Sequence, residues 1–503
     1  MRPNPPKQSA PTALARSCDL PGGAATAALI ADLEALAPIS GGVVAVATPE
    51  FSQFFAFGRN GPFGPPLRGP ERFQIGSISK SMAALLAARL IGEGRLYLDT
   101  PVRSILPWLK LPAGAGDPTI AHLLNHTTGW IAGNDALPGE LGQVLGLAET
   151  RAGSAPGAYF HYSNIGYVVL GAAIAQLTGR PFHAALRELV FEPLGMGDAF
   201  ANVTGAERSA IVPGTVPTRD DAAWRPGSPL SEATWVEPAG ADGNVAASAA
   251  TLLRFATAIT DPAGVPGADW LPAAVALLGS ELAPGGEEIL TAGRHLTITE
   301  ARYGLGVNIE TSDAGGLLTH GGGMIGHGAF MIAHESRGVA VSVLVSGPGE
   351  RPYAELLARA IHASALESIG NPASNLVDIS PGLQEPVAAL HATRLPLRRG
   401  AGTLEGLTGT FRSYSPWFPH LEIGVNVDDE LVLRAYAGVE APTDDVPLVA
   451  TQGEPLRFRL GSDPRLPESI TFGGIVGGIA QTLERDGCRY ARVAERADTQ
   501  PLR

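Results

Sequence analysis

A serine and a lysine three positions apart, Ser77 and Lys80, stand at the start of a stretch rich in alanine and leucine. The stretch from Ser81 to Gly92 predicts a buried helix, and one helical turn places residues i and i+3 on the same face. A hydroxyl beside an amine that can accept its proton is the minimum equipment of a serine nucleophile. We therefore expect a buried central helix that carries Ser77 at its start.

The use of lysine in this chain makes that pair more informative. Lys7, Lys80 and Lys110 are the lysines among 36 lysine and arginine residues. Arginine does not give up its proton at ordinary pH, so it cannot serve as a base. The spacing alone is nevertheless weak evidence, because a serine near a helix start more often caps the helix than acts as a nucleophile.

Two further motifs follow along the chain. A Tyr-Ser-Asn segment at 162–164 precedes an apolar run, and a His-Gly-Gly-Gly segment at 320–323 stands beside a β-like stretch. In this order, S-x-x-K, Y-x-N and H-x-G resemble the active-site motifs of the serine β-lactamase and penicillin-binding-protein superfamily, and most of all its class C branch, peptidase family S12. Further phrases typical of this branch lie at 73–76, 90–99, 122–129, 192–196 and 303–306. The resemblance covers residues 25 to 370.

The resemblance implies a chemical role for the first two motifs. Ser77 would attack a carbonyl carbon and form an acyl-enzyme, while Lys80 or Tyr162 takes its proton. These two side chains would form one coupled proton network, so the sequence leaves open which of them is the formal base. Tyr162 would then protonate the leaving group.

Substrate-binding groups are implied as well. The backbone N–H groups of Ser77 and Gly323, beyond the step through Gly322, would form the oxyanion hole. Asn164 would hold the lysine and a substrate amide oxygen. His320 replaces the lysine that meets the substrate carboxylate in β-lactamases, and the charge of an imidazole depends on pH. We expect the substrate to align like an added strand, with less reliance on a fixed anionic group. The alternative is an ordinary histidine beside a glycine turn.

The pattern of apolar segments predicts an α+β fold, with an antiparallel sheet flanked by helices and an all-helical lobe. The expected strands include Tyr303–Ile309 and Gly338–Val345, and Tyr353–Ser368 is an expected closing helix. Short alternating runs within residues 402–503 predict a small antiparallel β-barrel, which resembles the lipocalin-like domain of several S12 peptidases.

Four segments are expected along the chain. They are a mobile N-terminal arm at 1–24, a β-lactamase-like serine hydrolase domain at 25–370, a linker at 371–401 and the barrel domain at 402–503. The barrel is either a packing module or a module whose loop narrows the cleft, and Pro416–Pro419 is a candidate for such a loop.

Composition excludes several other classes of protein. A net charge of −13 argues against nucleic acid and against an anionic membrane surface as partners. Two cysteines, Cys18 and Cys488, give neither a disulfide framework nor a metal-ligand spacing, so no cofactor and no metal are expected. No membrane segment and no signal peptide are recognisable. The expectation is a cytoplasmic protein, or a periplasmic one if the start codon is misassigned; self-association is left open.

Three functions compete on this evidence. The first is a peptide hydrolase for small linear peptides with D- or other non-standard residues. The resemblance includes an enzyme of this branch that opens linearised microcystin, which fits the same description. The second is a carboxylesterase or transacylase, because the same motifs serve these reactions in the superfamily. The third is a penicillin-binding protein that is acylated and then stalls. Deacylation separates the third from the first two.

Overall fold

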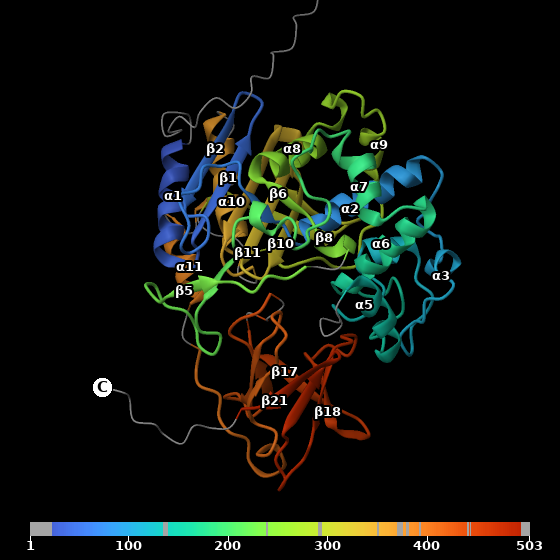
Figure 1. The fold of residues 1–503 in the computed structure, drawn as a ribbon, viewed down its shortest axis with the longest axis vertical. Helices are drawn as coiled ribbons and strands as arrows, with labels where there is room; N and C mark the ends of the chain where they lie inside the picture. The colour runs from blue at the N-terminus through green and yellow to red at the C-terminus, as the bar shows by residue number, and fades with distance from the viewer. Residues whose placement is uncertain are drawn as a thin grey trace, which may run out of the picture.

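The computed structural model describes residues 23–133, 139–237, 240–289, 294–349, 352–369, 376–378, 382–391, 394–439, 442 and 444–493. It consists of a sheet-and-helix domain and a smaller barrel below it in the view of Figure 1. The expected N-terminal arm lies almost entirely outside the described residues.

Seven antiparallel strands of the described chain form the central sheet, in the order β2-β1-β12-β11-β10-β9-β8. Their bounds are Gly41–Ala47 (β1), Ser52–Gly58 (β2), Ile298–Tyr303 (β8), Asn308–Ser312 (β9), Gly315–Met324 (β10), His327–His334 (β11) and Val339–Ser346 (β12). Strands β1, β11 and β12 are buried along their whole length. Their continuous apolar sequences are explained by this position, because a central strand covered on both faces has no polar side.

Helices cover both faces of the sheet. On one face, α1 (Gly23–Leu36) and α10 (Tyr353–Ser368) share an apolar core with the strands, and α11 (Gln384–Leu390) packs against α1. On the other face, α2 (Ile78–Gly92) and α8 (Ala249–Thr260) lie in a second, larger core. Figure 1 shows α1 and α10 on one side of the strands and α2 and α8 on the other.

The helical lobe extends the second core away from the sheet. It contains α3 (Val102–Ile105), α4 (Ile120–Leu124), α5 (Glu140–Gly146), α6 (Asn164–Thr178), α7 (Phe182–Leu186) and α9 (Leu271–Leu278). Three small two-stranded pairs complete this domain: β3 (Arg72–Gln74) with β6 (Ala246–Ser248), β4 (Thr215–Pro217) with β5 (Leu230–Glu232), and β7 (Arg294–Leu296) with β13 (Leu376–Asp378). Strand β3 leads directly into the nucleophile motif.

The C-terminal strands close into an antiparallel barrel of eight strands, counted over the described residues. They are β14 (Gly409–Arg412), β15 (His420–Val425), β16 (Leu431–Arg434), β17 (Val446–Thr451), β18 (Glu454–Leu460), β19 (Ser469–Gly473), β20 (Thr482–Arg485) and β21 (Cys488–Arg492). The barrel has its own apolar core, in which the rings of Phe411, Phe458 and Phe472 meet.

The expected fold class is confirmed, and so are the strand at β12 and the closing helix α10. The expected strand Tyr303–Ile309 is wrong. β8 ends at Tyr303 and β9 begins at Asn308, and the residues between them form the turn. Gly306 there has φ +75°, a backbone conformation that only glycine adopts readily. The segment expected to be a linker contains β13 and α11.

Two further properties of the described residues concern membrane-spanning helices and cysteine pairing. Within them, no helix combines the length and the apolar character needed to cross a membrane. Cys488 is a free, partly exposed cysteine. Cys18 lies outside the described residues.

Two buried histidines on β11 generate a prediction about acid stability. Burial lowers the pKa of His327 and that of His334 from 6.5 to about 4. Between pH 6.5 and 4 the unfolded chain therefore binds protons that the folded chain excludes, so stability falls as pH falls through this window. A shift of this size corresponds to on the order of 3 kcal/mol per histidine.

We expect His327→Gln to flatten this pH dependence, since an amide N–H can still donate to the carbonyl oxygen of Val212, which Nε2 of His327 contacts at 2.8 Å. Urea unfolding at a series of pH values between 4 and 7 measures the effect. His183→Gln, at a histidine that is only partly buried, is the control. An unchanged slope in His327→Gln would contradict the prediction.

Candidate active site

Ser77 stands at the position that precedes α2, with its hydroxyl not engaged in capping the helix. It has helical backbone angles and makes no side-chain capping hydrogen bond. The preceding Gly76 has φ +50°, which turns the chain sharply from β3 into the helix. The capping alternative weighed from the sequence is therefore wrong, and the hydroxyl is available for chemistry.

Lys80 lies one turn into α2 with its side chain fully buried. Its Nζ donates to Ser77 Oγ at 2.8 Å and to the carbonyl oxygen of Asp242 at 2.7 Å. The same atom lies 5.0 Å from the ring centroid of Tyr162 and 5.7 Å from that of Tyr167. The i, i+3 relation expected from the sequence thus places the amine against the hydroxyl.

Tyr162 completes a set of three side chains around the nucleophile, because it also shares a hydrogen bond with Ser77. Burial, together with the nearby carboxylate of Glu287, raises the pKa of Tyr162 well above 10. The phenol is therefore protonated in the resting site, where it can donate to the serine. To act as a base it would need the positive charge of Lys80 to stabilise its anion.

The position of Tyr162 is fixed by the start of α6 and by His126. Ser163 caps this helix, accepting from the N–H of Gly166 and donating to the carbonyl oxygen of Ile131. The ring of His126 lies 4.2 Å from that of Tyr162, and its Nδ1 accepts from the N–H of Ser163 at 3.0 Å. The backbone φ of His126 is +57°, in the left-handed region. Its stacking on Tyr162 was not foreseen.

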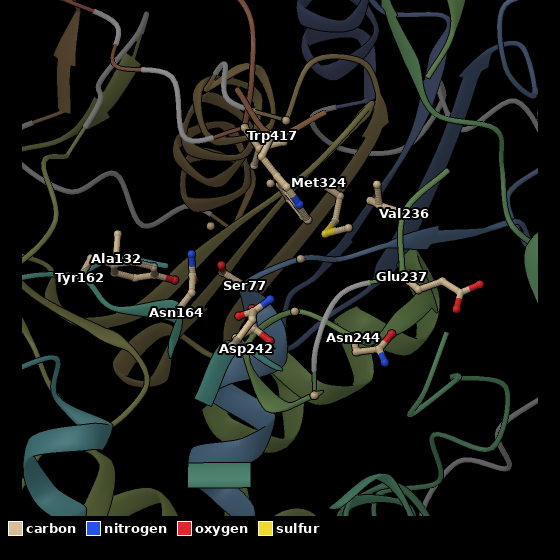
Figure 2. A pocket seen from close by; sticks show the side chains of 18 of the residues that line it. Ser77, Ala132, Tyr162, Asn164, Val236, Glu237, Asp242, Asn244, Met324 and Trp417 are labelled. Atoms are coloured by element: carbon tan, nitrogen blue, oxygen red, sulfur yellow. The ribbon is translucent and has the colours of Figure 1, made fainter. Parts of the chain in front are cut away.

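Asn164 is the first residue of α6 and lines the same cavity as Ser77 and Tyr162. Its backbone N–H donates to the carbonyl oxygen of Ala132 at 2.6 Å. In Figure 2 the side chains of Ser77, Tyr162 and Asn164 gather on one side of the cavity. The structure therefore brings together the residues of the first two motifs.

His320 lies behind the cavity wall rather than in it. Its Nδ1 lies 2.6 Å from the carbonyl oxygen of Gly321, and since a carbonyl only accepts, this nitrogen carries the proton. Nε2 then accepts from the hydroxyl of Tyr303 at 2.7 Å. Burial lowers the pKa of His320 to about 3, so the imidazole is neutral. His320 therefore bonds to Tyr303 and Gly321 and is not among the residues that line the cavity.

The glycines after His320 pack directly against the nucleophile turn. A Cβ on Gly322 would lie 1.9 Å from the carbonyl oxygen of Ile75 and 3.2 Å from the backbone nitrogen of Ser77. A Cβ on Gly76 would lie 2.8 Å from the backbone nitrogen of Gly323. Side chains are thus excluded at these positions, and the backbone at 322–323 lies directly against the turn that carries Ser77.

Ser77, Tyr162, Asn164 and Gly323 line a cavity of about 950 Å³ between the two domains. Its walls come from the hydrolase-domain loops and, on the opposite side, from barrel residues Trp417, Val439, Leu460, Glu468 and Arg485. In Figure 2 the indole of Trp417 reaches toward Ser77 from above, beside Met324. The loop singled out in the sequence therefore does border the site.

Sequence reasoning missed three residues of this site. Tyr303 bonds to His320, Glu287 lines the cavity and accepts from Asn308 at 2.7 Å, and Glu468 enters from the barrel. Burial raises the pKa of Glu287 above 4.5. Tyr303 belongs to a recognised phrase and could have been found; nothing in the local sequence marks the two glutamates.

Together these groups can activate a hydroxyl, stabilise an oxyanion and deliver a proton to a leaving group. Among the described residues, no group of three or more histidine, cysteine, aspartate or glutamate side chains is arranged to hold a metal ion.

The neutral phenol of Tyr162 generates a testable expectation. Tyr162→Phe should slow acylation of Ser77 by a peptide p-nitroanilide about 10²–10⁴-fold, the usual contribution of a proton-transfer group, because the amine needs a proton to leave. Stopped-flow release of nitroaniline measures this rate. Tyr167→Phe is the matched control, because Tyr167 is also buried but donates to the carbonyl oxygen of Leu124. Equal acylation rates in the two variants would mean that the phenol of Tyr162 is dispensable.

Comparison with known proteins places this site in context. The chain is 34% identical to esterase EstB of Burkholderia gladioli over 169 residues, which are 29% of this chain and 43% of the esterase. The match thus spans less than half of the length of that relative.

Solved structures extend the likeness to almost the whole chain. The structure of SurE has a TM-score of 0.53 and 21% identity, covering 94% of this chain and all of SurE. The D-amino acid amidase of Ochrobactrum anthropi SV3 has a TM-score of 0.56 and 22% identity, covering 69% of this chain and 98% of the amidase. At these low sequence identities, the structural likeness shows a shared fold and nothing more. The model of the beta-lactamase family matches residues 27–366, so this chain belongs to the beta-lactamase family, as its three motifs indicated.

Proposed function

We propose that this protein is a serine hydrolase that cleaves amide bonds of small linear peptides, with D- or non-standard residues, through an acyl-enzyme on Ser77. The observation that carries the proposal is the contact of Lys80 Nζ with Ser77 Oγ at 2.8 Å, with the phenol of Tyr162 on the same hydroxyl. A serine held between an amine and a phenol has both a route for its proton and a donor for the leaving group.

In the proposed reaction the oxygen of Ser77 attacks the substrate carbonyl carbon. Its proton passes to the network of Lys80 and Tyr162, and the backbone N–H groups of Ser77 and Gly323 hold the oxyanion. Loss of one such donor typically costs about 10²–10³ in rate. The amine leaves with a proton from Tyr162, which gives the acyl-enzyme. Water then attacks the ester carbon, gives up a proton to the same network and releases the acid together with the free serine hydroxyl.

The third motif supports a peptide substrate over a β-lactam. Because His320 is buried, neutral and bonded to Tyr303, it offers no positive charge to a substrate carboxylate. The cavity volume lies at the upper end of the range for small-molecule sites, which leaves room for several residues of a peptide. The likeness in fold to a D-amino acid amidase and to SurE, which has also been solved with D-Leu, supports the stereochemical part of the proposal.

A carboxylesterase or transacylase is the second candidate. It is favoured by the 34% identity to esterase EstB over 169 residues. An acyl-enzyme serves ester and amide substrates alike, and the leaving group decides between them. The alkoxide of an ester leaves more readily than an amine, so an esterase depends less on the proton of Tyr162.

One panel of substrates separates these candidates. Wild type, Ser77→Ala and Ser79→Ala are incubated with L- and D-residue peptides, short-chain esters and a penicillin, and the products and protein masses are measured by mass spectrometry. Ser79 is the matched control, since it is buried in the same motif and accepts from the N–H of Val245.

We expect peptide cleavage that Ser77→Ala abolishes and that Ser79→Ala largely retains. Ester turnover without peptide cleavage would favour the esterase. A stable penicillin adduct without any product would contradict both and indicate a penicillin-binding protein. Full activity in Ser77→Ala would place the nucleophile elsewhere.

A further inference from the structure

A carboxylate from the barrel reaches into the catalytic domain beside the Tyr-Ser-Asn motif. Glu468 ends the loop between β18 and β19, and it is buried, with its side chain only 9% exposed. One of its oxygens, Oε1, accepts from the backbone N–H of Ala132 at 2.7 Å and from Nε2 of His161 at 2.7 Å. Although burial acts to raise it, the pKa of Glu468 is held below 4.5 by the hydrogen bonds from His161 and Ala132, so the group is a carboxylate.

Both of these partners lie beside residues 162–164, the catalytic segment, which carries Tyr162 and Asn164. His161 immediately precedes Tyr162 in the chain, and its backbone N–H donates to the carbonyl oxygen of His126, the residue that stacks on Tyr162. The carbonyl oxygen of Ala132 accepts from the backbone N–H of Asn164 at 2.6 Å. A single oxygen of Glu468 therefore bonds to Ala132, whose carbonyl oxygen holds the N–H of Asn164, and to the side chain of His161, the neighbour of Tyr162.

The loop that carries Glu468 is itself held firmly against the catalytic domain. A Cβ on Gly153 would lie 2.0 Å from the carbonyl oxygen of Arg465, so the two backbones are in direct contact there. The guanidinium of Arg465 lies 4.0 Å from the ring centroid of Tyr159. Both contacts are made by Arg465, three residues before Glu468, and they hold this loop against the catalytic domain.

We propose that Glu468 is a positioning residue for the reaction on Ser77, and that the barrel is thereby a working part of the catalytic site. It acts through Ala132 and His161 on the placement of Asn164 and Tyr162. The inference rests on the proposed function, because it concerns the rate of the same acylation step. Displacement of a reacting group by about 1 Å can cost about 10²-fold in rate.

The test compares Glu468→Ala and Glu468→Gln with a control in the same interface. Glu454→Ala is the matched control: Glu454 is also a barrel glutamate, and it pairs with Arg151 of the catalytic domain at 3.4 Å without touching the catalytic segment. For each full-length variant, kcat and KM for peptide and the rate of Ser77 acylation by p-nitrophenyl acetate are measured, with thermal unfolding as a check on folding.

We expect Glu468→Ala to lower kcat and the acylation rate about 10²-fold with little change in KM. Glu468→Gln should retain much of the rate, because an amide oxygen can accept the same two hydrogen bonds. A Glu468→Ala variant as fast as Glu454→Ala would overturn the inference. A raised KM with unchanged kcat would also overturn it, since Glu468 would then contact the substrate.

A double variant keeps the test decisive if Glu468→Ala is unstable. Residues that act in one network lose less together than the sum of their separate losses. His161→Ala combined with Glu468→Leu, which removes the acceptor but fills the space, should therefore be no slower than the slower of the two single variants, and additive losses would contradict the network. A wild type that is acylated at Ser77 but cleaves no peptide would contradict the proposed function only, because the acylation rates still report on Glu468.

Discussion

The contact between the amine of Lys80 and the hydroxyl of Ser77 is the interaction on which the rest of the site depends. A buried amine is costly unless its hydrogen bonds are made, and here Ser77 and the carbonyl oxygen of Asp242 receive them, beside two aromatic rings. The arrangement requires α2 to start abruptly at Ser77, which the positive φ of Gly76 allows. It also requires a strand without side chains against that turn, which Gly322 provides.

The second domain adds groups of its own to the cavity beside Ser77. Barrel residues form one wall of the cavity, with the indole of Trp417 facing Ser77 and Glu468 bonded behind the Tyr-Ser-Asn segment. The cavity beside Ser77 is therefore bounded by both domains, and the proposal of a peptide substrate rests partly on that geometry. The neutral His320 removes the fixed cation expected of a β-lactamase at the third motif. The neutral His320 and the cavity between the two domains therefore both favour the proposed peptide substrate over a β-lactam.

Sequence patterns predicted the parts of this structure that are local or periodic. The pair Ser77 and Lys80 lies within one helical turn, and the buried strands and helices follow from their apolar runs. Both could therefore be predicted from the sequence. The bond of His320 to Tyr303 depends on the pairing of strands β8, β9 and β10. A continuous strand was predicted at 303–309, where the turn between β8 and β9 lies. The contact of Glu468 with His161 joins residues 307 positions apart, in different domains. No local pattern encodes such a pair, because packing of the two domains creates it.

The most direct test of the central claim is to map where, and how fast, the protein reacts with a fluorophosphonate. Peptide mapping by mass spectrometry locates the adduct, and its rate of formation is compared between wild type and Lys80→Ala. We expect a single adduct on Ser77 in wild type, formed about 10²–10⁴-fold faster than in Lys80→Ala, because the variant lacks the amine of the proton network around the hydroxyl. An adduct on another residue, or equal rates in the two proteins, would contradict it.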